Sequence, residues 1–491
     1  MKKLNILLAA VIVVGLIGCD LLDQQPQQSL PADEIKTAPD GIQDLLTGMY
    51  DGLQNPNIAG GNYNVLPEIM ADNVTWSGSF VNYARQADRD MLPSDPQIQN
   101  WWNVSFREIN TANLILNNVG DIDDPAFTEE DRDLVRGEAH FARGMLYFEM
   151  ARMYAKPWGF TTDNSHDAVP LRTTPVEGVP DFENLPRESL SAIFQQVEDD
   201  LVAAANLLPD QGLRADRRAT RYTALGYLMR LELEKGNYSG AADYAGQIIG
   251  SGNFSLTGNP AAPFQNEFSS ESIFEIVHTS QDNPGVNAGQ NAFYASTGRG
   301  GRGDIQYSSD FFSALNSTVS EDQQTVIDAA GYSVVDLRSN LIDTGSTSTV
   351  KFPDGTNNAD NVINMRLPDI MLARAEALVE ISASILDVPQ EAYDLLNEVR
   401  RRSIVVTDAG GNDFSELIEY NPGDFASREE MIDAILLDRR VELAFEGDRF
   451  HTLKRKGIAI RGLEPDNNRI TFPIPQGEMD ANPNMVQNDG Y

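Results

Sequence analysis

The residue types that most often carry chemistry are sparse or scattered in this chain of 491 residues. Its one cysteine, Cys19, cannot form an internal disulfide. No Gly-x-Ser-x-Gly turn of a serine hydrolase is present. The histidines lie too far apart for any metal-binding spacing, and we expect each to be structural. They are His140, His166, His278 and His451. We therefore predict no catalytic residue, no metal site and no cofactor.

Two short motif matches are interpreted as coincidental. Gly298-x-Gly300-x-x-Gly303 fits the dinucleotide-binding pattern, but no apolar strand precedes it. The acidic run over 121–133 lacks the glycine and the terminal glutamate of a calcium-binding loop. Among 73 acidic residues, no pair stands out as the two carboxylates of a glycosidase. A glycan-degrading enzyme remains an alternative that the residues do not support.

Two long stretches without helical periodicity, 55–97 and 251–368, are rich in Gly, Asn, Ser and Asp. Long irregular segments in a compact chain are usually functional or disordered, and scattered aromatic residues favour function here. Aromatic rings that belong to no helical stripe are free to face a ligand, although they could equally pin the loops to the helices. The predicted binding residues are Asp72, Asn73, Trp76, Tyr83 and Arg85 in the first stretch, and Phe293, Tyr294, Arg299, Arg302 and Tyr307 in the second.

Helical periodicity dominates the rest of the chain and must position these stretches. Tyr222, Leu225, Met229 and Leu233 lie on one helical face, and a break at 235–237 is followed by a second, alanine-rich helix. Such a helix–turn–helix pair resembles a tetratricopeptide unit. Trp101 and Trp102, at the start of a helix, are expected in the core. Further helices are predicted over 41–53, 98–119, 129–154, 188–208, 369–381, 390–402 and 427–456.

The last of these predicted helices carries charges of both signs on a partly apolar stripe. Its members are Ile435, Arg439, Glu442, Glu446, Arg449 and Leu453. This pattern suggests ion pairs that hold the helix to the scaffold. A structural role is favoured over a catalytic one.

Charge and the N-terminus indicate a cellular compartment. A formal net charge of −36 excludes a general nucleic-acid binder, because such binding relies on clustered Lys and Arg. Lys2 and Lys3 precede an apolar run over 4–17, which is too short to span a bilayer and is typical of a signal peptide. The run ends in Leu-Ile-Gly-Cys19, which resembles a lipobox. We therefore predict a signal peptide over 1–18, lipidation of Cys19 as the only membrane attachment, and a tether over 19–40.

Several segments together resemble the RagB/SusD family of lipoproteins. The segment 438–455 reads DRRVELAFEGDRFHTLKR and is similar to the family signature, except that Thr452 replaces a common aspartate. Trp102, Phe106, Ala112 and Asn113 fit another family helix. Further matches lie at 137–148, 366–377, 396–402 and 473–491, in the expected order.

This resemblance implies a mainly α fold in which tetratricopeptide-like helical pairs carry long irregular loop insertions. It divides a single domain over 19–491 into a helical part over 41–250, a loop-rich insertion over 251–368 and a helical part with the signature over 369–491. It also implies a protein facing the outside of the outer membrane, which binds a nutrient, most often an oligosaccharide. The partner implied is a SusC-like TonB-dependent barrel, and no bond is made or broken. A structural tetratricopeptide-type adaptor is the other alternative, and whether the ligand is a glycan or a peptide stays open.

Overall fold

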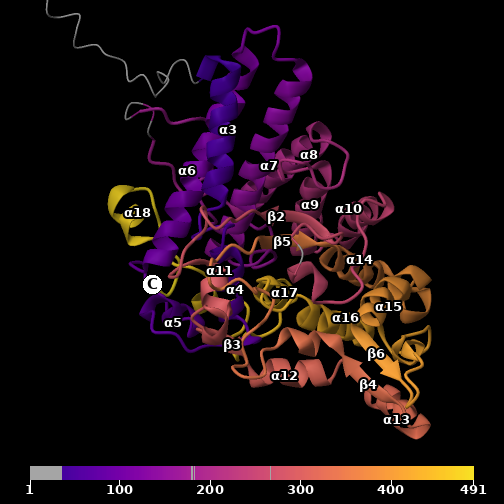
Figure 1. The fold of residues 1–491 in the computed structure, drawn as a ribbon. Coiled ribbons are helices and arrows are strands. Elements are labelled where there is room, and N and C mark those ends of the chain that lie inside the picture. The colour runs from indigo at the N-terminus through magenta and orange to yellow at the C-terminus, as the bar shows by residue number, and fades with distance from the viewer. Residues whose placement is uncertain (1–35, 179–180, 182, 266) are drawn as a thin grey trace, which may run out of the picture.

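Helices dominate the part of the chain that the computed structural model describes, namely residues 36–178, 181, 183–265 and 267–491 (Figure 1). Cys19 and the predicted signal peptide lie outside these residues. The long helices are α3 (Pro39–Leu53), α6 (Pro96–Asn118), α7 (Glu129–Tyr154), α8 (Leu190–Leu207), α9 (Arg221–Lys235), α10 (Tyr238–Gly250), α14 (Leu367–Ile381) and α15 (Gln390–Ser403). Their bounds agree with the predicted ranges to within about two residues.

Helices pack in pairs, as the family resemblance implies. α3 packs on α6, α7 on α8, α9 on α10 and α14 on α15, while α10 also packs on α14 and joins two of the pairs (Figure 1). The turn between α9 and α10 uses Gly236, whose φ of 67° favours glycine. Asn237 then caps α10 by accepting a hydrogen bond from the Gly240 N–H. The prediction of a mainly α fold built on tetratricopeptide-like pairs is confirmed.

The two irregular stretches contain short elements joined by long-range pairing. The first holds α4 (Asn62–Met70), β1 (Val74–Trp76) and α5 (Val81–Ala87). The second holds β2 (Ser272–Ile276), α11 (Gly289–Tyr294), β3 (Ile305–Tyr307), α12 (Ser309–Asn316), α13 (Glu321–Ala330), β4 (Ser333–Asp336) and β5 (Val362–Arg366). With β6 (Ile404–Thr407), the described strands form three two-stranded antiparallel sheets, β1–β3, β2–β5 and β4–β6. Much of both stretches remains irregular.

The prediction of a single helix over 427–456 is wrong. The structure has α16 (Arg428–Glu442) and α17 (Asp448–Arg455), separated by a turn in which Phe445 and Gly447 have φ of 68° and 79°. The turn redirects the chain so that α17 packs on α4. The N–H of Gly447 donates to Glu68 of α4 at 3.1 Å. The contact with α4, which is distant in sequence, therefore ends the helix within a segment whose local pattern predicts one continuous helix. A last short helix, α18 (Gln476–Ala481), follows near the C-terminus.

Ion pairs hold this signature segment to the scaffold, which confirms the structural interpretation of its charged stripe. Arg439 lies against Asp369 of α14 and Asp448 of α17. Buried Arg366, at the end of β5, pairs with Glu442 at 2.6 Å and with Glu446 at 2.7 Å. Further pairs join Glu442 to Arg402, Glu446 to Lys351, Arg449 to Asp72, and Asp438 to both Arg338 and Arg400.

The main core runs through the helical pairs and under much of the two irregular stretches, and two smaller clusters surround Ile327 and Leu341. Trp101 and Trp102 are 0% and 3% exposed and belong to this core, as predicted. Among the described helices, none combines the length and the apolar character that crossing a bilayer requires.

Candidate functional site

The structure brings the two predicted binding stretches together. Strand β1 pairs with β3, so that Val74 lies opposite Tyr307 and Trp76 lies opposite Ile305. The Trp76 indole stacks on the Tyr83 ring with centroids 5.2 Å apart and meets the Phe293 ring edge-on at 5.7 Å. The sequence alone did not predict that these two groups of residues are neighbours.

Four of the five predicted rings lie in the core. Tyr83, Phe293, Tyr294 and Tyr307 are at most 6% exposed. The rings of Tyr294 and Tyr307 both pack against Phe445 in the turn before α17, at 4.8 and 4.5 Å. Burying a large ring provides more stabilisation than leaving it in water, and these four rings thus fasten the irregular stretches to the scaffold. None of these four rings is exposed to a ligand. Among the five predicted rings, only Trp76 remains a candidate for ligand contact.

The predicted polar residues of the first stretch are also engaged with the scaffold. The Asp72 carboxylate accepts from Arg449 at 2.8 and 3.0 Å and lies 3.3 Å from Arg440. Burial by itself would raise the pKa of Asp72, but the hydrogen bonds and charges of these arginines hold it below its usual value. Asn73 is fully buried, donates to Glu68 and accepts from Arg440. Arg85 lies 3.1 Å from Asp95.

A partly exposed surface remains around Trp76, which we call the Trp76 face and define by Trp76, Phe80, Asn287 and Arg302. The Arg302 guanidinium lies 4.4 Å from the Phe80 ring centroid. It donates to Asp304 at 2.7 Å and to Asn287 at 3.2 Å. Arg299 is 42% exposed and lies 3.9 Å from Asp343. The face thus combines two aromatic rings with charged and amide groups that can bond to hydroxyls.

Phe80 and Asn287 belong to this face although the sequence analysis missed them. Phe80 follows Trp76 by four residues in a polar, glycine-containing segment, and that spacing is the one signal that could have identified it. Asn287 lies in a loop before α11 and carries no such signal. Its place beside Arg302 depends entirely on the path of the chain.

A concave surface lies beside α6. This groove has a volume of about 360 Å³, within the ~300–1,000 Å³ range of ligand pockets. Half-buried Phe106 contributes an aromatic ring, and Asn110, Arg172 and Asn482 contribute polar groups. We call it the α6 groove. It competes with the Trp76 face as a place for a ligand.

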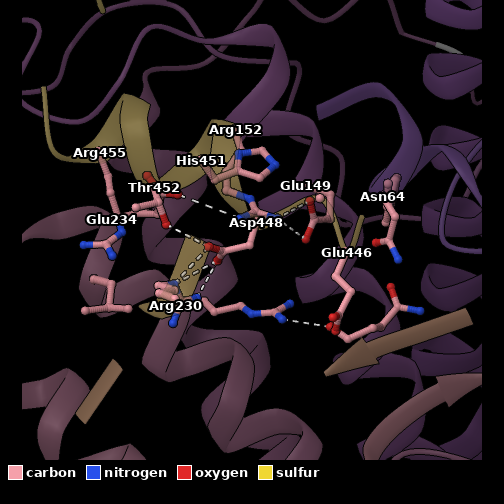
Figure 2. Close-up of a pocket in the computed structure, with 15 residues that line it drawn as sticks. Asn64, Glu149, Arg152, Arg230, Glu234, Glu446, Asp448, His451, Thr452 and Arg455 are labelled. Carbon is pink, nitrogen blue, oxygen red and sulfur yellow. Dashed lines mark hydrogen bonds and ion pairs between the residues drawn. The ribbon is translucent and has the colours of Figure 1, made fainter. Parts of the chain in front are cut away.

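A small cavity lies where α7, α9 and α17 meet, and Figure 2 shows charged side chains converging on it. Its volume is about 40 Å³, enough for a few waters but far below the size of a ligand pocket. Arg152 donates to Glu149 at 2.6 Å, and Thr452 donates to Asp448 at 3.1 Å. The cavity therefore belongs to a charged junction between helices.

His451 lines this cavity, and its side chain is buried. Neither ring nitrogen has a hydrogen-bond partner within the described chain. Burial, together with the positive charges of Arg152 and Lys454, keeps the pKa of His451 well below its usual value. Within the described ranges, no three His, Cys, Asp or Glu side chains are placed to share a metal ion.

Comparison with protein families gives two matches along the chain. Residues 20–233 match a family model described as "Starch-binding associating with outer membrane". Residues 339–461, which include the signature segment, match the model of the SusD family.

Whole-chain comparisons agree with these matches. The chain is 25% identical to SusD-like protein P2 of Formosa agariphila, in an alignment that covers 100% of both chains. It is 23% identical to SusD-like protein P38 of the same organism, over 100% of this chain and 99% of the relative.

Solved structures show the same fold. A SusD superfamily protein from Bacteroides thetaiotaomicron is 24% identical with a TM-score of 0.75, covering 92% of this chain and 99% of its own. A SusD-like carbohydrate binding protein from Bacteroides vulgatus is 18% identical with a TM-score of 0.70, covering 91% and 97%. These likenesses confirm the fold.

Proposed function

The chain belongs to the SusD/RagB family, and on that premise we propose that it is a lipid-anchored outer-membrane protein that binds an oligosaccharide. In this proposal the bound sugar passes to a SusC-like TonB-dependent barrel, and no bond is made or broken. The family membership supports carbohydrate binding in general, since one matching model is described as starch-binding and one solved relative as carbohydrate binding.

The observation that carries the proposal is the Trp76 face. Trp76 and Phe80 are only partly buried, while Arg302 lies against the Phe80 ring and donates to the exposed Asn287. Sugars present apolar C–H faces and a rim of hydroxyls, so that a ring flanked by polar groups matches both. The face lies on short elements fastened to a helical scaffold, which limits the entropy lost on binding.

The proposed partner rests on the family resemblance. A lid over the mouth of a wide barrel would bury more surface than the ~1,200–2,000 Å² of a standard interface. A glycan-degrading enzyme and a purely structural adaptor are the alternatives. Release of reducing sugar by the purified protein would favour the first, and failure to bind any oligosaccharide or peptide would favour the second.

The test is calorimetric titration of oligosaccharides into variants of the Trp76 face. We expect Trp76→Ala to lower affinity by about 1–3 kcal/mol, on the scale of base–aromatic stacking, and Trp76→Phe to keep most of it. Arg302→Gln removes a polar contact without removing a ring and should lower affinity as well. Thermal melts of each variant establish that the fold is kept.

Phe106→Ala in the α6 groove is the matched control, because it also truncates a half-buried ring. It should leave affinity unchanged. Loss of affinity in Phe106→Ala alone would move the site to the α6 groove. Unchanged affinity in all the variants of the Trp76 face would overturn its assignment.

A further inference from the structure

Four arginines contact one short segment of the chain, residues 70–74, which links α4 to β1, and a fifth contacts one of these four. Arg89 donates to the carbonyl of Met70, and Arg461 donates to the carbonyl of Val74. Arg440 and Arg449 both bind Asp72, from α16 and α17. Arg469 donates to the carbonyl of Arg89 at 2.8 Å. We call this group the arginine array and define it as Arg89, Arg440, Arg449, Arg461 and Arg469.

The array is only partly neutralised. Asp72 is shared by Arg440 and Arg449. Arg89 and Arg461 donate to main-chain carbonyls, and neither has a carboxylate within 4.0 Å in the described part of the chain. Arg469 pairs with Asp90, but that carboxylate is 75% exposed and the pair is weak. Three further acidic groups face the array, namely exposed Asp88 and Asp310 and buried Glu68, and none of them makes an ion pair with it.

Two of these arginines are held in unfavourable surroundings. Arg89 and Arg461 have φ of 56° and 46°, in the left-handed region that a side chain with a Cβ rarely adopts. The Arg89 Nε is buried without a hydrogen-bond partner. Burial, together with the positive charges of Arg461 and Arg469, lowers the pKa of Arg89 to about 10. Strained backbone and unmet donors at one place are typical of functional positions.

The array also contrasts with the charge of the whole chain. With 73 acidic and 37 basic residues, the protein as a whole repels polyanions. Within the array, Arg461 and Arg469 are exposed, and they create a place where an anion can nevertheless bind. The planar guanidinium pairs well with carboxylate or sulfate oxygens through two parallel hydrogen bonds.

We propose that the arginine array binds sulfate or carboxylate groups of an acidic oligosaccharide. This inference rests on the proposed function and names its ligand class, because β1 runs from Val74, which Arg461 contacts, to Trp76. The ring at Trp76 then contacts an uncharged sugar face, while the array contacts the anionic substituents of a neighbouring unit.

The test compares three classes of oligosaccharide by calorimetric titration: sulfated, uronate-containing and neutral. The full-length protein should bind at least one acidic class, with an affinity that falls as salt rises. The double variant Arg461→Gln, Arg469→Gln should lower that affinity by about tenfold or more, as expected for lost charge-assisted hydrogen bonds. The conservative Arg461→Lys variant should lose less.

Arg401→Gln is the matched control, because Arg401 is 52% exposed on α15 and pairs with Glu419 at 3.3 Å. It should bind acidic oligosaccharides like the unaltered protein. Competition by inorganic sulfate shows whether the sulfate group alone is recognised, and preference between the two acidic classes shows which anion the array takes.

Three results would overturn the inference and can be told apart. Binding of neutral oligosaccharides alone, with the double variant unchanged, would refute the anionic ligand while the proposed function stands. Binding of no oligosaccharide in any class would refute both. If Arg401→Gln loses as much affinity for acidic oligosaccharides as the double variant does, the loss arises from overall charge. That result would also refute binding at the arginine array.

Discussion

Single buried charges hold the signature segment in place. Arg366 is 1% exposed and lies between Glu271 at 3.3 Å, Glu442 at 2.6 Å and Glu446 at 2.7 Å. Burial would raise the pKa of Glu442, but the positive charges of Arg402, Arg366 and Arg338 keep it well below its usual value. A buried network of this kind is costly to break, because removing one member leaves the others unpaired.

Arg366→Met should therefore lower the free energy of unfolding by about 3–5 kcal/mol. Urea denaturation followed by circular dichroism measures this change through the transition midpoint. Arg401→Met, which removes an exposed partner of Glu419, should change it by at most about 0.5–1 kcal/mol. Equal midpoints for the two variants would show that the network does not stabilise the fold.

Between elements, the turn from α16 to α17 depends on backbone conformations that a continuous helix would not have. Phe445 has φ of 68° but is fully buried, with its ring packed on Tyr294 and Tyr307, so that packing offsets its strain. Gly447 has φ of 79° and lies directly on α4. A Cβ added at Gly447 would come within 2.8 Å of Asn64 Cα and 2.9 Å of the Tyr63 carbonyl oxygen.

Gly447→Ala should destabilise the protein through both strain and this clash with the backbone of α4. Gly331→Ala is the matched control, because Gly331 has φ of 73° but open space around its Cα. We expect the control to cost about 1–2 kcal/mol from strain alone and Gly447→Ala to cost clearly more. Thermal unfolding compares the two. If they are equally stable, the contact between the turn and α4 does not position α17.

For the molecule as a whole, the predicted lipid on Cys19 determines where the protein resides. We expect Cys19→Ala to release the protein from outer-membrane fractions, because the acyl chains are the predicted attachment. Cell fractionation and immunoblotting measure the change. The experiment is done with and without the partner barrel, since a tight complex could hold the unlipidated protein. Membrane retention without the barrel would contradict the lipobox interpretation.

Local patterns were enough to predict the scaffold. The helix predicted over 129–154 is α7, and the pair broken at Gly236 is α9 and α10. Apolar periodicity, caps and turn residues act within a few positions of the chain, so they can be identified before the fold is known. The family signature over 438–455 is likewise a linear pattern, and the comparisons confirm the family that it indicates.

Contacts between distant segments set the surface that could bind a ligand. Val74 lies opposite Tyr307, the rings of Tyr294 and Tyr307 are buried on Phe445, and α4 interrupts the signature helix at Gly447. The arginine array likewise gathers residues from α16, α17 and the segments that follow α5 and α17. Whether a ring or a charge in an irregular stretch is buried, paired or free depends on which distant surface covers it. Whether such a side chain is exposed is therefore determined by packing in three dimensions and cannot be predicted from residue spacing along the chain.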